Sequence, residues 1–179
     1  MSQPLRKTGA CHLLGDDIPL DEGLMAFKYA IERITDPAVL IPHLLEQIDP
    51  DFAARVRPGD LVVAGRNFAC GKPHIQGFIA MLALDMGIVC ASMSHKSLRR
   101  AVAVGLPVLQ IGDHARELAQ TGDRLDVDFA SGAIRNLTRG TSLQGAPMSP
   151  ILQGIVAEGG AAGRMRAWLA SHPDLAPAA

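Results

Sequence analysis

Three side chains that could do chemistry alternate along one short stretch of the sequence: Cys70, Lys72 and His74. An ammonium or an imidazole can bind a carboxylate or move a proton when its pKa is tuned. The surrounding pattern predicts that this stretch lies between a buried strand, Leu61–Ala64, and an amphipathic helix that begins at Pro73. Because the first N–H groups of a helix are unpaired, we expect an anion-binding turn here, with a lowered pKa for the Cys70 thiol.

Strands and helices alternate on the C-terminal side of this turn. The pattern predicts a second buried strand over Ile88–Ala91, a helix over His95–Val104 and a third strand over Pro107–Ile111. Further along, Arg124–Phe129 alternates polar and apolar residues, and Ala133–Leu137 follows a short turn, which predicts a hairpin. The sequence therefore predicts an α/β fold: a mixed sheet flanked by helices, with a C-terminal hairpin.

The N-terminal part is predicted to be helical after one short strand over Ala10–Leu14. Apolar spacing favours a helix over Leu24–Ile34. We expect one domain over residues 10–170, between flexible tails at 1–9 and 171–179.

Composition excludes several classes of protein. The chain has 179 residues, a net charge of −1 and only 4% aromatic residues, so neither a nucleic acid nor an anionic membrane is expected as a partner. The longest apolar run, Phe78–Leu84, is too short to span a bilayer. Three distant cysteines, Cys11, Cys70 and Cys90, have no metal-binding spacing and predict a reducing compartment. We expect a cytoplasmic protein.

Two charged stretches have more than one interpretation. The acidic turn at residues 15–22 is either a metal or substrate loop or a solvated surface loop. Lys96, Arg99 and Arg100 lie on or near one side of the predicted helix. They form either a solvated basic face or a patch for an acidic substrate or partner.

Several stretches, taken in order, resemble the small subunit of 3-isopropylmalate dehydratase, the swivel-domain half of the aconitase superfamily. Gly15–Ile18 resembles the opening Gly-Asp-Asn-Ile loop of that family, and Val63–Gly71 resembles its Val-Ala-Gly-x-Asn-Phe-Gly-Cys-Gly motif. Gly105–Pro107 resembles a Gly-Leu-Pro that opens a strand, and residues 122–138 resemble the closing hairpin. The likeness covers roughly residues 10–160.

The resemblance implies a swivelling β/β/α domain that docks on a separate large subunit. In that family, which serves leucine biosynthesis, the large subunit holds a [4Fe–4S] cluster, and the pair dehydrates and rehydrates a hydroxy-diacid. This chain would then bind neither metal nor cofactor itself. It would contact a small carboxylate substrate through a set of loop and helix residues: Asp17, Asp21, Asn67, Cys70, Gly71, Lys72, His74, His95 and Arg99.

The chain departs from the family pattern directly after Gly71. The family continues Ser-Ser-Arg-Glu-His, whereas this sequence has Lys72, a proline and His74. Neither lysine nor histidine reproduces a bidentate guanidinium. Three hypotheses follow: a hydro-lyase subunit with a changed hydroxy-di- or tricarboxylate substrate, in which Lys72 and His74 are catalytic; an inactive paralogue that binds or regulates a large subunit; or a stand-alone domain that binds a small acid. The ionisable replacements favour the first.

Overall fold

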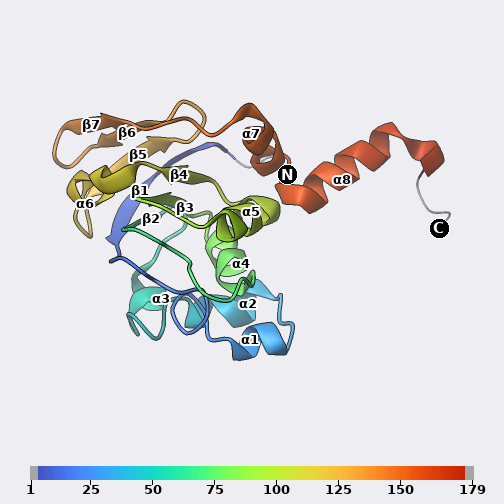
Figure 1. The fold of residues 1–179 in the computed structure, drawn as a ribbon, viewed down its shortest axis with the longest axis horizontal. Helices are drawn as coiled ribbons and strands as arrows, with labels where there is room; N and C mark the ends of the chain where they lie inside the picture. The colour runs from blue at the N-terminus through green and yellow to red at the C-terminus, as the bar shows by residue number, and fades with distance from the viewer. Residues whose placement is uncertain (1–3, 176–179) are drawn as a thin grey trace.

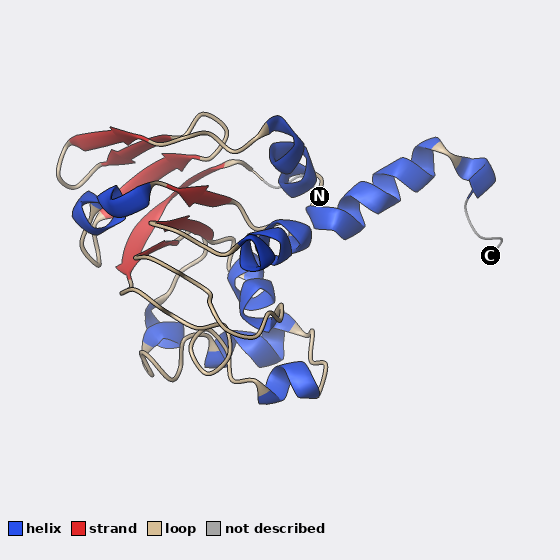
Figure 2. Cartoon of the chain, viewed as in Figure 1, coloured by secondary structure: helices blue, strands red, loops and turns tan. Residues whose placement is uncertain are grey.

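The protein is built on one seven-stranded mixed sheet. The computed structural model describes residues 4–175. The strand order is β4-β3-β2-β1-β5-β6-β7, and Figure 2 shows the strands as one curled layer beside the helices. The strands are β1 (Arg6–Leu13), β2 (Leu61–Ala64), β3 (Gly87–Cys90), β4 (Val108–Gln110), β5 (Arg124–Asp128), β6 (Ala133–Asn136) and β7 (Thr141–Gln144). The predicted α/β class, with a C-terminal hairpin, is confirmed.

The sheet has a parallel half and an antiparallel half, which meet at β1. Residues Arg6–Ala10 pair antiparallel with β5, and Cys11–Leu13 pair parallel with β2. Strands β2, β3 and β4 are parallel to one another, and β5, β6 and β7 are antiparallel. Every residue of β2 and β3 is buried, as continuous apolar runs predict for strands covered on both faces.

Helices cover both faces of the sheet and enclose two apolar cores. One core packs Phe52, Phe68 and Phe78 against one face, and the other packs Phe129 and Val156 against the opposite face. Figure 1 shows α8 projecting away from the body of the fold. The helices are α1 (Lys28–Ile31), α2 (Pro37–Leu40), α3 (Phe52–Arg55), α4 (Gln76–Ala83), α5 (His95–Val104), α6 (Ala115–Leu118), α7 (Pro150–Ala157) and α8 (Gly160–Ser171), with 3₁₀ turns η1 (Ile41–His43), η2 (Gly112–His114) and η3 (Pro173–Leu175).

The N-terminal strand starts earlier than expected. Arg6–Gly9 were predicted to belong to a flexible tail but form the first half of β1. This prediction was wrong because their partner is β5, more than 110 residues away, and local sequence does not reveal that pairing. Residues 1–3 of the predicted N-terminal tail and residues 176–179 of the predicted C-terminal tail lie outside the described residues.

Two predicted helices are shorter than expected. The helix expected over Leu24–Ile34 is limited to α1, a single turn. The helix expected from Pro73 begins at Gln76, after an irregular loop. Positive φ angles at Asn67 and Ala69, of 55° and 58°, belong to that loop. Residues 70–74 are therefore a loop that precedes a helix, and they are not its first turn.

Helix α5 matches its prediction residue for residue. The Ser94 hydroxyl accepts a hydrogen bond from the Ser97 N–H, which satisfies one of the unpaired donors at the helix start. Gly105 ends the helix with φ of 102°, a left-handed conformation that glycine adopts readily. Within residues 4–175, no helix is both long enough and apolar enough to cross a membrane.

Candidate functional site

The loop between β2 and α4 lies at the carboxyl edge of the parallel strands, where α/β proteins commonly bind ligands. It is joined to two neighbouring loops by backbone hydrogen bonds. The Cys70 N–H donates to the Ile18 carbonyl at 3.2 Å, and the Leu20 N–H donates to the Cys70 carbonyl at 2.7 Å. The Phe68 N–H donates to the Ser92 carbonyl at 2.9 Å. The loops that follow β1, β2 and β3 therefore form one assembly.

Asn67 and Asp17 hold this assembly from within. The Asn67 side-chain amide donates to Asp17 Oδ1 at 2.8 Å, and the Asn67 backbone N–H donates to Ser92 Oγ at 2.9 Å. Both Asn67 and Asp17 have φ near 55°, a conformation that asparagine and aspartate tolerate better than most residues. The structure brings these two predicted site residues together, and their mutual hydrogen bond favours a scaffold role.

Gly71 and Asp21 form a second clamp. The Lys72 N–H donates to Asp21 Oδ1 at 3.1 Å. Gly71 has φ of 85°, and a Cβ atom on it would lie 2.2 Å from Asp21 Oδ1. Both the conformation and the close approach require glycine at this position. Asp21 thus fixes the backbone of the predicted substrate loop directly before the Lys72 side chain.

Lys72 presents a free cation at the edge of this loop. Its side chain is exposed, and Nζ lies 4.9 Å from the centroid of the Phe27 ring. A cation in this position is held weakly by the ring face. Lys72 makes no ion pair with any residue in the described part of the chain, so its ammonium is free to pair with a carboxylate.

His74 lies behind the loop and is 6% exposed. Its ring centroid is 5.9 Å from that of Phe27, and it borders a cavity of about 340 Å³ with Phe27 and Arg100. Neither ring nitrogen makes a hydrogen bond of normal geometry within residues 4–175. Burial lowers the pKa of His74, and the Asp21 carboxylate opposes that shift. His74 is therefore a neutral imidazole near pH 7, with the Gln76 side chain and the Leu20 backbone as its polar neighbours.

Cys70 is a protonated thiol, and the predicted lowering of its pKa is wrong. Burial raises the pKa of Cys70, and the carboxylates of Asp17 and Asp21 raise it further. The prediction relied on a helix that begins at Pro73, close to this residue, but α4 begins only at Gln76. Cys70 Sγ lies 3.6 Å from the Asp17 carbonyl oxygen, which it contacts as a weak donor.

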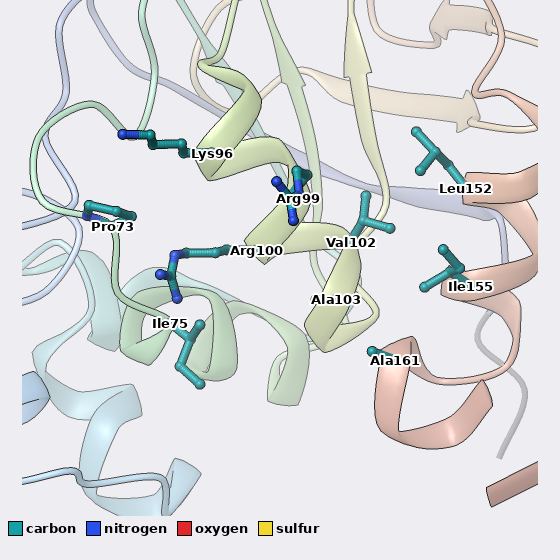
Figure 3. A pocket seen from close by; sticks show the side chains of 10 residues that line it. All are labelled: Pro73, Ile75, Lys96, Arg99, Arg100, Val102, Ala103, Leu152, Ile155 and Ala161. Atoms are coloured by element: carbon teal, nitrogen blue, oxygen red, sulfur yellow. The ribbon is translucent and has the colours of Figure 1, made fainter. Parts of the chain in front are cut away.

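The two predicted site residues on α5 have different surroundings. Arg99 lines a groove of about 750 Å³ together with Pro73 and Ile75, which belong to the loop between β2 and α4 (Figure 3). His95 is exposed at the start of α5 and lines neither this groove nor the cavity beside His74. The structure therefore brings Arg99 towards the loop and leaves His95 outside both cavities.

Sequence reasoning missed two residues of the site. Phe27 contacts the cation of Lys72 and faces the ring of His74, but it lies in a segment that was predicted to be helical and has no motif of its own. Ser92 was not among the predicted site residues, whereas its hydroxyl accepts a hydrogen bond from the Asn67 N–H. Both contacts depend on how separate loops meet, and no local signal reveals them.

The residues present do not fit a [4Fe–4S] cluster. Cys11 and Cys90 lie on separate strands, are fully buried, and have pKa values that burial raises to about 12. Such thiols are inert, whereas a cluster needs several thiolates within reach of one another. Within residues 4–175 there is no group of three or more His, Cys, Asp or Glu side chains arranged to hold a metal ion.

Comparison with known proteins places this fold and loop among dehydratase small subunits. The chain is 37% identical over 153 residues to the 3-isopropylmalate dehydratase small subunit of Moorella thermoacetica, an alignment that covers 85% of this chain and 90% of that one. It is 33% identical over 157 residues to the 2,3-dimethylmalate dehydratase small subunit of Eubacterium barkeri, covering 87% and 94%. No protein-family model matches the chain.

A solved structure agrees in fold. The crystal structure of 3-isopropylmalate dehydratase from Methanocaldococcus jannaschii superposes with a TM-score of 0.85 at 24% identity, covering 96% of this chain and 99% of that one. The mixed sheet and its clamped loop thus define a small subunit of the isopropylmalate and dimethylmalate dehydratase type. More particularly, the chain belongs to the 3-isopropylmalate dehydratase small-subunit family, which confirms the resemblance seen in its motifs. The name of these relatives implies a large-subunit partner.

Proposed function

We propose that this chain works with a large subunit as a hydro-lyase on a hydroxy-di- or tricarboxylate, and that its substrate differs from 3-isopropylmalate. The relatives named above already carry two different malate substrates in their names. This chain keeps Asn67, Phe68, Cys70 and Gly71 of the loop and replaces the Ser-Ser-Arg that follows in the resembling family. A change of several substrate-facing groups is what altered specificity requires.

The observation that carries the proposal is the contrast between the two parts of this loop. Asn67 and Gly71 are clamped by Asp17 and Asp21 through defined hydrogen bonds and a backbone close approach. A loop held this firmly is preorganised to receive a ligand, which lowers the entropic cost of binding. Directly after the clamp, Lys72 offers an ammonium that pairs with no carboxylate in the described residues.

Lys72 would bind one substrate carboxylate and thereby orient the acid. Its ammonium rests on the Phe27 ring at 4.9 Å, so a carboxylate replaces a weak contact with a charge-assisted hydrogen bond. In the proposed reaction Lys72 neutralises the charge of the bound acid. A lysine makes this contact as a point charge, whereas arginine would fix two oxygens in one plane.

His74 would transfer a proton. A general base must be unprotonated at the working pH, and burial lowers the pKa of His74 as that role requires. Its two nitrogens make no hydrogen bond of ideal geometry in the described chain, although Gln76 and the Leu20 backbone lie close to the ring, and the ring borders the 340 Å³ cavity that Arg100 also lines. Because His74 is only 6% exposed, the substrate must reach it through this cavity, beside Phe27.

We assign the iron–sulfur cluster to the large subunit, because the cysteines of this chain do not fit one. When bound there, the cluster supplies a Lewis acid for the substrate hydroxyl. This chain would contribute the carboxylate contact of Lys72, the proton transfer of His74, and the exclusion of water by Phe27 over the loop.

A second function is favoured by one observation: His74 is buried, and the serines and arginine of the resembling family are absent. On this alternative, the chain binds a large subunit, regulates it and performs no chemistry. The experiment is to reconstitute the chain with its large subunit, load the cluster, and assay 3-isopropylmalate, 2,3-dimethylmalate and a panel of other hydroxy-diacids. Turnover of a panel member at a higher kcat/KM than 3-isopropylmalate supports the proposal. Stable assembly with no turnover of any acid supports the alternative.

A further inference from the structure

An open groove runs between α5 and the helix pair α7–α8. Its volume is about 750 Å³, and its apolar wall is formed by Leu152 and Ile155 of α7, which project towards Val102 of α5 (Figure 3). At one end α8 packs closely on α5, where a Cβ atom on Gly160 would lie 2.4 Å from the Ala103 carbonyl oxygen. The groove therefore has a fixed apolar wall.

The opposite wall of the groove is cationic. Lys96, Arg99 and Arg100 project from α5, and none of them makes an ion pair with any residue between 4 and 175. By contrast, other arginines of the chain do pair, such as Arg135 with Asp126. The net charge of the chain is −1, so three unpaired cations in one groove are a local feature. Their charge is complementary to an acidic group from outside the chain.

The apolar surface continues from the groove onto the projecting helix α8. Ala161 lines the groove, and Met165 and Trp168 follow it at spacings of four and seven residues, which places all three on one side of the helix. Met165 and Trp168 are 57% and 45% exposed. Apolar surface of this extent is too long for a small acid to cover and is typical of a protein interface, where tryptophan and methionine are enriched.

We propose that this groove and the Ala161–Trp168 stripe of α8 form a docking surface for an acidic, amphipathic segment of the large subunit. The inference rests on the proposed function, which requires that partner. The apolar face of such a segment would cover Leu152 and Trp168, while its carboxylates would pair with the cations of α5. Pro73 and Ile75 line the same groove and belong to the substrate loop. A partner seated there would contact the loop that carries Lys72, as a site shared by two subunits demands.

The test measures the affinity of the full chain for its cluster-loaded large subunit by titration calorimetry. Two groove variants, Leu152→Asp and Lys96→Glu, are compared with two matched controls, Leu137→Asp and Lys28→Glu. Leu137 is 47% exposed on the hairpin side of the sheet and Lys28 is exposed on α1, and neither lines the groove. Circular dichroism and thermal melting check that each variant is folded.

We expect Kd to rise at least tenfold for each groove variant and to stay within about twofold of wild type for each control, since replacement of a hot-spot residue at the centre of an interface has an effect of this size. At saturating large-subunit concentration, both groove variants should recover wild-type kcat. Unchanged affinity of both groove variants in a pair that assembles would overturn the docking surface and leave the proposed function standing. Loss of turnover at saturation with unchanged Kd would also overturn it, because the groove would then bind the substrate acid. A wild-type chain that does not bind the large subunit overturns both.

Discussion

A carboxylate in the antiparallel half of the sheet and an ammonium beside the parallel half have opposite surroundings. In the antiparallel half, Asp126 accepts hydrogen bonds from Arg6, Thr8 and Arg135, at 2.5–3.0 Å, and its pKa is held well below the usual range, first by Arg6. Beside the parallel half, Lys72 stands next to a clamped loop and pairs with no carboxylate among the described residues. Paired charges serve the fold, and unpaired ones are available to a ligand or partner.

Buried polar side chains also differ in how well their hydrogen bonds are satisfied. Asp123 is satisfied by the Gln120 N–H and by the side chains of Asn136 and Arg139. His74 is buried to a similar degree, yet both of its ring nitrogens lack a normal hydrogen bond in residues 4–175. A buried polar atom without a hydrogen bond costs free energy, and functional sites are one place where such atoms are found; His12 Nδ1 is another such atom of this chain. The comparison therefore separates groups that stabilise the protein from groups that act.

The largest effect is expected at His74. His74→Gln keeps a polar side chain of similar length but cannot take up a proton, so kcat of the reconstituted pair should fall about 100-fold or more. Because burial lowers the pKa of His74 from its ordinary value of 6.5, kcat of the wild-type pair should decrease in acid with a midpoint below pH 6.5. Steady-state kinetics across pH measure both effects.

The matched control for this variant is His43→Gln. The His43 side chain is partly exposed. Its Nδ1 lies 2.7 Å from Glu46 Oε2, so this histidine already has a hydrogen-bond partner. Its replacement should leave kcat and the pH profile unchanged. Equal loss of activity in both variants would contradict the role of His74, since a histidine that is paired with Glu46 would then matter as much.

A smaller effect, on stability alone, is expected at Asp126. Asp126→Asn removes the charge that Arg6 and Arg135 share, and should lower the free energy of unfolding by about 1–2 kcal/mol at pH 7. The loss is moderate because both arginines are more than half exposed and water can solvate them. Urea unfolding measures it, and kcat at saturating substrate should not change.

This difference between Asp126→Asn and wild type depends on pH in a defined direction. The pKa of Asp126 is lower in the folded than in the unfolded chain, where it is about 3.9. The stability that Asp126 contributes is therefore fully present above about pH 4 and is lost as pH falls from there towards its folded pKa. Unfolding curves of the two proteins should converge in acid. A gap that stays constant down to pH 2 would contradict the assignment.

The smallest effect is expected at Arg66. Its guanidinium makes two hydrogen bonds to Asp113, at 2.6 and 2.7 Å, but both side chains are about two-thirds exposed. Exposed pairs contribute little, so Arg66→Ala should change neither the free energy of unfolding nor kcat measurably. Because Arg66 precedes Asn67 in the same loop as Lys72, this variant compares a paired cation of the loop with an unpaired one. A large loss of activity would show that a paired cation also serves the site.

Features set by local sequence were predicted well. Ser94 and Gly105 supply a cap and a left-handed stop within a few residues of α5, and its bounds were predicted correctly. The apolar run Leu61–Ala64 is also a local signal, and it predicted β2 correctly, because a strand that is buried on both faces is continuously apolar. The motifs around Asn67 also indicated the correct family.

Features that depend on contacts between distant segments were not predicted. The Pro73 signal for a helix start is local, but the clamp between Asp21 and Lys72 holds the loop open and α4 begins only at Gln76. The pKa of Cys70 was predicted with the wrong sign for a similar reason, because burial in the folded chain raises it, and Asp17 and Asp21 of another loop raise it further. The sequence predicted the position of the loop, whereas tertiary contacts decide which of its side chains are free to bind a ligand.

We propose above all that Lys72 binds the substrate carboxylate. The direct test is the kcat/KM of Lys72→Ala in the reconstituted pair, measured on the acid of the panel with the highest wild-type kcat/KM. The matched control is Lys28→Ala, because Lys28 also lies 4.9 Å above an aromatic ring, that of Tyr29, and is outside the loop. Loss of a charge-assisted contact predicts a fall in kcat/KM of about 10- to 100-fold for Lys72→Ala and none for Lys28→Ala. Wild-type kcat/KM in the Lys72→Ala pair would contradict the account.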